Sequence, residues 1–121
     1  MSRDLLLYLR DIRQHCDEIA DHIARLDVEA FARDRTRYKA VVFSLLVIGE
    51  AAKQVPRAWR ARYTEVDWRR IAGLRDVIAH GYFALSTAIL WDIVRNRVPE
   101  LREAVERMLQ DPALPVPPWE S

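Results

Sequence analysis

Residues 74–82 place four side chains suited to phosphodiester chemistry close together in the chain: Arg75, Asp76, His80 and Tyr82. The guanidinium of an arginine is always charged and can bind a phosphate through two parallel hydrogen bonds. A histidine can transfer a proton near neutral pH. The stretch therefore indicates a candidate site that acts on phosphodiesters. An alternative stays open, because a single arginine or histidine near a helix end is commonly a surface charge or a cap for backbone carbonyls.

The positive charge of the chain is concentrated in its middle. Residues 33–75 carry eleven basic against four acidic side chains, whereas residues 1–32 and 76–121 each carry four basic against seven acidic. The basic and aromatic residues of this segment include Arg33, Arg35, Arg37, Lys39, Arg57, Arg60, Arg62, Arg69, Arg70 and Arg75, with Tyr38, Trp59, Tyr63 and Trp68 among them. Arginine and aromatic side chains together bind single-stranded nucleic acid through its phosphates and bases. A solvated basic face over ordinary core aromatics is the alternative, and composition alone slightly favours it.

Composition favours an all-α protein. The chain has 121 residues, of which 50% are hydrophobic, and only 3 glycines, and no stretch sustains the alternation of a strand. We expect one helical domain over residues 1–110, followed by a proline-rich tail over residues 111–121. No apolar run approaches the roughly 20 residues of a membrane span, and no signal peptide is evident, so a soluble cytoplasmic protein is expected. The single cysteine, Cys16, fits a reducing compartment and leaves no cysteine cluster for a metal.

The first two predicted helices carry different apolar patterns. Residues 3–26 repeat apolar side chains at spacings of three and four, which is typical of a bundle seam that buries Cys16 and leaves His15 beside it, exposed. Residues 27–31 break the pattern and predict a turn in which Phe31 packs back onto the core. A second helix is predicted from about residue 34 or 36 to just before Pro56.

The central run of the second helix, residues 40–49, is apolar nearly all round. One face of such a helix can pack on the core of a small domain, so the other face predicts a partner, most simply a second copy of the chain. Gly49 would allow another backbone to approach closely. Glu50 is either exposed on the next turn or a partly buried acid that faces an arginine.

Two further helices and the tail complete the prediction. Residues 56–66 are expected to be irregular, and Asp67 is the expected N-cap of a third helix over residues 68–80. Ser86 is the expected N-cap of a fourth helix, which Pro99 should kink. In the tail, four prolines favour an extended polyproline conformation, with Trp119 as its candidate anchor.

Helical geometry separates the two candidate catalytic side chains. His80 follows Arg75 by five residues, which corresponds to about 140° around a helix and ~7.5 Å along its axis. One regular helix cannot easily bring both side chains to one phosphate. Either the helix bends at Gly81, which would release Tyr82 into a loop, or a second copy of the chain contributes to the site.

The motif Arg75-x4-His80-x-Tyr82 resembles the signature of the HEPN superfamily, and more narrowly that of its HepT-like toxin branch. Residues 48–52, Ile-Gly-Glu-Ala-Ala, and residues 68–74 also resemble that branch, so the likeness spans roughly residues 3–110. The resemblance implies an up-and-down bundle of four to five helices that forms a homodimer or higher oligomer, with the motifs of both copies lining one cleft.

The resemblance also implies an activity and roles for the site residues. Intact members are metal-independent endoribonucleases, with neither metal nor cofactor, and their substrate is RNA. Arg75 would hold the scissile phosphate, and His80 would assist the attack of the ribose 2′-OH. Asp76 would fill the polar position that often follows the arginine, with Glu50 as a further supporting residue.

In the HepT-like branch the toxin is paired with a minimal nucleotidyltransferase antitoxin, in a type VII-like toxin–antitoxin system. The antitoxin transfers AMP to the motif tyrosine, which is Tyr82 in this chain. Two other functions remain open. The chain would otherwise be a non-catalytic helical module that binds a nucleotidyltransferase, or a nucleic-acid-binding protein that uses its basic middle and has no need of His80.

Overall fold

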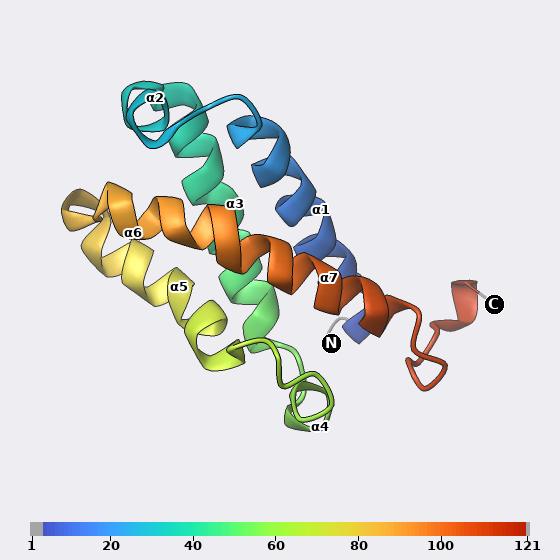
Figure 1. Cartoon of the computed structure of the whole chain (residues 1–121). Helices are drawn as coiled ribbons and strands as arrows, with labels where there is room; N and C mark the ends of the chain where they lie inside the picture. The colour runs from blue at the N-terminus through green and yellow to red at the C-terminus, as the bar shows by residue number, and fades with distance from the viewer. Residues whose placement is uncertain (1–3, 121) are drawn as a thin grey trace.

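The computed structural model describes residues 4–120, and over this range every regular element is a helix. The four longest helices are α1 (Leu5–Ile23), α3 (Arg35–Lys53), α5 (Trp68–Gly81) and α7 (Val98–Leu109). They run alternately up and down: α3 packs against α1 and α5, and α7 packs along α1 (Figure 1). Short helices α2 (Val28–Arg33), α4 (Arg57–Arg60) and α6 (Thr87–Asp92) join them. The predicted all-α fold is confirmed, and no helix within this range is long and apolar enough to cross a membrane.

Helix α1 buries the predicted seam. Its buried side chains are Leu6, Leu9, Ile12, Cys16, Ile19 and Ile23. The helix begins at Leu5, inside the predicted bounds, whose first residue lies outside the described part of the chain. The predicted exposure of His15 is wrong, because Ser44 of α3 lies opposite it. The two side chains are 3.0 Å apart between Nδ1 and Oγ, and only 17% of the His15 side chain is exposed.

Side-chain caps fix where four of the helices begin. In each case the side chain of the residue before the helix accepts a hydrogen bond from a backbone N–H three residues later; these residues are Asp27, Asp34, Asp67 and Ser86. Such a cap satisfies a donor that the first helical turn leaves free. The predictions for Asp67 and Ser86 are confirmed. The turn predicted for residues 27–31 is wrong, because the cap at Asp27 starts helix α2. The predicted packing of Phe31 onto the core is confirmed.

Helix α3 is apolar on two faces, as its sequence indicates. Val41, Leu45 and Ile48 are fully buried in the core. Phe43 is exposed and Val47 is half-buried, so the opposite face presents apolar side chains to solvent. A protein of this size can cover only one side of such a helix with its own core.

A π-helical segment, Ile93–Arg97, separates α6 from α7. The backbone N–H of Val98 donates to the carbonyl of Ile93, five residues earlier. Pro99 lies in the first turn of α7, where its missing N–H costs nothing, but its ring would clash with the carbonyl of Arg95 in a regular helix. The wider π turn relieves this clash. The helix predicted after Ser86 is thus found as three contiguous segments, and its irregularity lies directly before Pro99.

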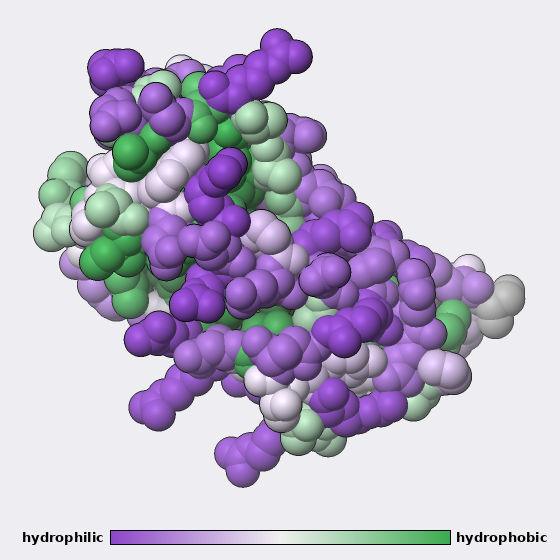
Figure 2. All heavy atoms as spheres, viewed as in Figure 1, coloured by the Kyte–Doolittle hydropathy of each residue, from purple (hydrophilic) through white to green (hydrophobic). Residues whose placement is uncertain are grey.

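The tail folds back onto the bundle. Leu114 and Pro117 are buried, while Trp119 is exposed, so Trp119 is not the anchor that the sequence predicted. Arg10 of α1 donates to the carboxylate of Glu120 at 2.8 Å and holds the end of the tail. Figure 2 shows a largely hydrophilic surface over α7, whereas apolar atoms gather where α5 meets α6.

Candidate active site

The candidate site begins with a close contact between α3 and α5. A Cβ atom added at Gly49 would lie 2.8 Å from the backbone nitrogen of Arg75 and 3.3 Å from the carbonyl oxygen of Ile71. Only glycine permits this distance. The predicted close approach of a backbone at Gly49 is found, and the approaching backbone is that of α5 in the same chain. The contact places the polar side chains of the last turn of α3 next to Arg75.

Four charged side chains of alternating sign form a chain across this contact. Glu50 Oε2 lies 3.7 Å from Nε of Arg75, and Nη1 of Arg75 donates to Oδ1 of Asp76 at 3.2 Å. Lys53 Nζ donates to the same carboxylate, 3.2 Å from Oδ1. The hydrogen bond from Lys53, and then that from Arg75, lowers the pKa of Asp76 below its usual value. We call these four residues, Glu50, Lys53, Arg75 and Asp76, the charged chain.

Glu50 combines the two alternatives that its sequence context left open. It faces an arginine, Arg75, but 57% of its side chain is exposed, so the expectation of a partly buried acid is wrong. The carboxylate is therefore a solvated counter-ion of Arg75 and not a buried one.

Arg75 keeps most of its donors free for a ligand. Nearly half of its side chain, 48%, is exposed. Of the five N–H donors of a guanidinium, one is used in the hydrogen bond to Asp76. The remaining donors can bind two oxygens of a phosphate, which is the geometry that makes arginine a common phosphate ligand.

His80 lies in the last turn of α5 and is exposed. Helix α5 continues without a break to Gly81, whose φ of −132° is not the left-handed conformation of a glycine cap. A bend at Gly81 was one of the two alternatives that the sequence left open, but α5 carries Arg75 and His80 on one helix that ends at Gly81. Within a single copy the two side chains therefore lie about 140° apart around that helix. Within residues 4–120, the His80 imidazole forms no hydrogen bond and no ion pair.

Tyr82 begins a 3-10 turn, Tyr82–Ala84, that continues directly from α5 and replaces the predicted loop. Its ring is half-buried against the core and makes an edge contact with Phe83, with the ring centres 5.4 Å apart. The phenol oxygen makes no hydrogen bond to the described chain. Because that part of the chain has no buried side-chain oxygen or nitrogen without a partner, this oxygen is not fully buried and reaches solvent.

Many residues of the basic middle segment have structural roles. Tyr38 and Trp68 are buried in the core, and Trp59 stacks on Tyr63 with the ring centres 6.4 Å apart. Arg60 donates to the backbone carbonyls of Ala52 and Val55, at 2.7 and 2.9 Å, and so caps the end of α3. The interpretation of the aromatics as ordinary core residues is therefore correct for Tyr38 and Trp68.

Two residues at the site had not been singled out in the sequence. Lys53 lies three positions after Glu50, so both share one helix face, and that spacing could have identified it. Phe83 directly follows Tyr82 of the motif, and this position could have identified it as a candidate site residue from the sequence. Neither the ion pair of Lys53 with Asp76 nor the exposure of Phe83 can be read from the sequence, because both depend on how α3 and α5 pack.

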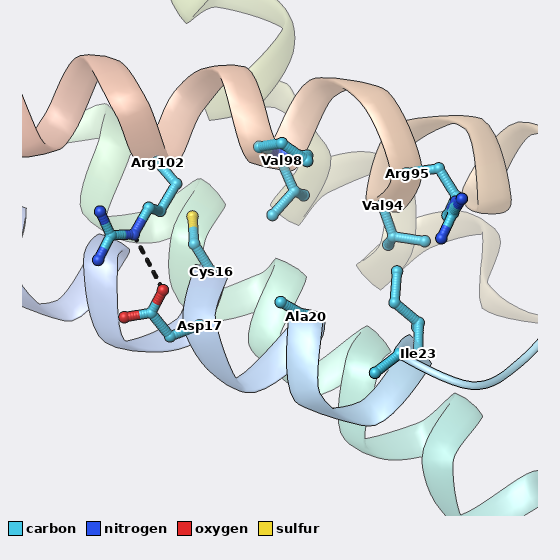
Figure 3. Close-up of a pocket in the computed structure, with 10 residues that line it drawn as sticks. Cys16, Asp17, Ala20, Ile23, Val94, Arg95, Val98 and Arg102 are labelled. Atoms are coloured by element: carbon cyan, nitrogen blue, oxygen red, sulfur yellow. Dashed lines mark hydrogen bonds and ion pairs between the residues drawn. The ribbon is translucent and has the colours of Figure 1, made fainter.

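Two cavities are present, and neither is lined by Arg75, His80 or Tyr82. One, of about 300 Å³, opens between α1 and the π-helical segment and is lined by Cys16, Ala20 and Val98 (Figure 3). Burial raises the pKa of the Cys16 thiol to about 12, so the thiol is not a nucleophile at neutral pH. The other, of about 480 Å³, lies between α5 and α7 and is lined by Ile71, Leu74 and Ile93 among others. Within the described residues, no group of three or more His, Cys, Asp or Glu side chains is placed to hold a metal ion.

An all-helical bundle is the fold expected of the HEPN superfamily, and comparison with known families shows that the chain belongs to it. The family model described as "Ribonuclease HepT-like" matches residues 12–108, and the chain belongs to that family.

Curated relatives agree with this assignment. A protein of Caldanaerobacter subterraneus subsp. tengcongensis, named "Putative RNase TTE0752", is 36% identical over 85% of this chain and 92% of its own length. "Putative RNase MJ0127" of Methanocaldococcus jannaschii is 37% identical over 91% of each chain. A protein of Thermococcus cleftensis, named "Probable ribonuclease HepT", is 32% identical over 89% of this chain and 98% of its own length. No solved structure matches the chain significantly.

Proposed function

We propose that the protein is an endoribonuclease that cleaves RNA without a metal ion, with Arg75 and His80 as its catalytic residues. The observation that carries the proposal is the exposed guanidinium of Arg75, which keeps free donors and shares one helix with an exposed His80. Membership of the HepT-like ribonuclease family and the names of the relatives support the same activity.

In the proposed reaction the nucleophile belongs to the substrate. The ribose 2′-oxygen attacks the adjacent phosphorus as its proton is removed, and the bond from phosphorus to the 5′-oxygen of the next nucleotide breaks. The leaving oxygen takes up a proton, and the products are a 2′,3′-cyclic phosphate and a 5′-hydroxyl. Arg75 stabilises the negative charge that develops on the phosphoryl oxygens, and His80 transfers a proton.

We further propose that the working site lies in a cleft between two copies of the chain. Arg75 and His80 diverge on the unbroken helix α5, so a second copy offers the simplest way to bring an arginine and a histidine to one phosphate. The outward face of α3, with Phe43 and Val47, supplies an apolar surface on which a second copy can pack.

The activity is tested with purified protein and RNA of defined sequence. We expect His80→Ala to reduce the cleavage rate about 10²- to 10⁴-fold, the usual contribution of a general acid or base, and Arg75→Ala to reduce it comparably. His22→Ala is the matched control, because that histidine lies on α1, outside the candidate site, and its variant should cleave normally.

Two further results decide the mechanism. EDTA should leave cleavage intact, and a 2′-deoxy substitution at the cleavage position should abolish it. Full activity of His80→Ala on purified RNA, or loss of cleavage in EDTA, would rule out the mechanism.

We also propose that the protein acts in the cytoplasm as the toxin of a toxin–antitoxin pair, silenced when a minimal nucleotidyltransferase transfers AMP to Tyr82. The phenol oxygen of Tyr82, two residues after His80, reaches solvent and supports this assignment. An AMP group there would add a negative charge and a bulky base where the substrate phosphate must bind. After incubation with the partner and ATP, intact-mass measurement should show one added AMP, which should be absent from Tyr82→Phe.

A non-catalytic module that binds a nucleotidyltransferase is the second candidate function. The divergence of Arg75 and His80 on one helix favours it, because a single copy does not assemble a catalytic pair. One assay distinguishes the two functions. If the protein is a non-catalytic module, wild-type protein and His80→Ala should leave RNA equally intact, and both should bind the nucleotidyltransferase.

A further inference from the structure

Phe83 is the most exposed large hydrophobic residue of the described chain: 99% of it is open to solvent. It lies in the middle of the 3-10 turn that follows α5, and the turn is closed by a hydrogen bond from the backbone N–H of Leu85 to the carbonyl of Tyr82. The ring makes an edge contact with Tyr82, at an interplanar angle of 82°. The fold therefore presents an aromatic ring to solvent beside the candidate site.

The other aromatic side chains are already engaged or lie elsewhere. Phe31, Tyr38 and Trp68 are buried, and Trp59 and Tyr63 stack on each other under arginine side chains. Phe43 makes an edge contact with His15. Trp119 is exposed, but it lies in the tail. Phe83 is thus the aromatic residue next to the motif whose faces remain open, and no arginine of the described chain covers it.

The position of Phe83 relative to His80 is limited by the chain itself. Phe83 follows His80 by three positions, so their Cα atoms lie no more than about 11 Å apart, a span that one or two nucleotides can bridge. A nucleotide whose phosphate is next to His80 can therefore place its base, or that of its neighbour, over the Phe83 ring. Unpaired bases stack on exposed aromatic side chains, and every base has a face suitable for this contact.

We propose that Phe83 is a positioning residue of the ribonuclease site, on which the base adjacent to the scissile phosphate stacks. The proposal rests on the proposed ribonuclease function and adds a substrate-binding contact to it. Stacking would fix the nucleotide that His80 and Arg75 act on, and it would require that base to be unpaired. Preference among bases would follow stacking strength, because the ring offers no hydrogen bond to read base identity.

The test uses an oligonucleotide with a single ribonucleotide in a 2′-deoxy chain, so that only one position can be cleaved. Two versions of the oligonucleotide are compared: one carries every base, and the other has an abasic site next to the scissile phosphate. On the version with every base, Phe83→Ala should lower kcat/KM roughly 5- to 150-fold, the range expected for losing one stacked base. Phe83→Trp should retain most of the activity. On the abasic substrate, wild type and Phe83→Ala should cleave equally.

Trp119→Ala is the control for loss of an exposed aromatic side chain, and it should cleave like wild type. If Phe83→Ala discriminates against the abasic substrate as strongly as wild type does, the base does not stack on Phe83 and the proposal is overturned. Light scattering identifies the competing explanation. A change in the molar mass of Phe83→Ala would show that Phe83 belongs to a protein interface, which also overturns the proposal.

A binding measurement tests the stacking contact on Phe83 independently of the ribonuclease activity. Binding of a 2′-O-methyl RNA, which cannot be cleaved, is measured on His80→Ala and on the double variant His80→Ala with Phe83→Ala. Weaker binding by the double variant supports the stacking contact even if wild type cleaves no RNA. Equal binding by both overturns the contact while leaving the ribonuclease activity, measured separately, in place.

Discussion

The carboxylate of Asp76 joins the two helices of the site through two cations. It accepts hydrogen bonds from Lys53 of α3 and from Arg75, its neighbour on α5. A substrate phosphate can bind the donors of Arg75 that Asp76 leaves free, or replace the carboxylate on Nη1. If Arg75 turns from Asp76 to the substrate, Asp76 keeps its ion pair with Lys53. The carboxylate of Asp76 therefore still has a cation beside it when Arg75 binds a phosphate.

Lys53 should be the main cause of the low pKa of Asp76, because its hydrogen bond makes the largest contribution. We expect Lys53→Met to raise the pKa of Asp76 towards its ordinary value of about 3.9, and Arg75→Met to raise it less. A carboxyl ¹³C NMR titration measures both shifts. Since the folded pKa lies below the ordinary one, the interaction is fully present above about pH 4 and is lost as the pH falls through the folded value.

Lys39→Met is the control for this titration, because Lys39 is an exposed lysine elsewhere on α3 and should leave Asp76 unchanged. An unchanged pKa of Asp76 in Lys53→Met would show that the two side chains do not interact in solution.

The Cys16 thiol should resist alkylation in the folded protein. Its pKa of about 12 results chiefly from burial, and secondly from the charge of Asp17, so almost no thiolate forms at pH 8. Iodoacetamide at pH 8 should label the native protein far more slowly than the unfolded one, whose thiol has a pKa of about 8.5. Mass spectrometry measures the rates. Equal labelling of native and unfolded protein would show that the thiol is not buried.

At the scale of the elements, Gly49 sets the distance between α3 and α5. We expect Gly49→Ala to destabilise the fold by about 1–3 kcal/mol, because the new methyl group would overlap the backbone nitrogen of Arg75, which cannot yield as a flexible side chain would. Thermal or urea denaturation measures the change in the free energy of unfolding. The same variant should reduce cleavage by displacing Arg75.

Gly73 provides the matched control on the same pair of helices. An added Cβ at Gly73 meets nothing within 4 Å. Gly73→Ala should therefore stabilise the protein by about 0.5–1 kcal/mol, since alanine favours the helix over glycine. If both variants change stability equally, the contact at Gly49 does not determine the packing of the two helices.

Local signals explain which elements the sequence could predict. Asp67 and Ser86 cap helices through hydrogen bonds to residues three positions away, and both were predictable for that reason. The π-helical segment depends on how Pro99 clashes with the preceding helical turn, which the sequence does not show. The cap at Asp27 lies in a stretch without a clear hydrophobic period, so the sequence did not indicate the helix that follows it. The motif residues could be named from their types and spacing, whereas Lys53 entered the site only through tertiary packing.

At the scale of the whole molecule, the question is how Arg75 and His80 meet. The sequence left two answers, a bend in the helix or a second copy, because spacing alone does not say whether a helix is regular. Helix α5 runs regularly through both residues, which removes the bend. The outward apolar side chains of α3 identify a face for a second copy, but Leu45 belongs to the core, so a charge placed there would unfold the chain.

Mixing two inactive variants tests whether two copies share the site. In a dimer with an arginine from one copy and a histidine from the other at each site, a pairing of Arg75→Ala with His80→Ala contains one intact site and one doubly defective site. Random pairing makes half of the dimers mixed, so co-refolded variants should recover about one quarter of the wild-type cleavage rate. Each variant refolded alone should stay inactive, and wild type refolded in the same way gives the reference rate. Recovery close to zero, with mixed dimers demonstrated by two affinity tags, would show that Arg75 and His80 act from the same copy, and α5 would then have to deform when RNA binds.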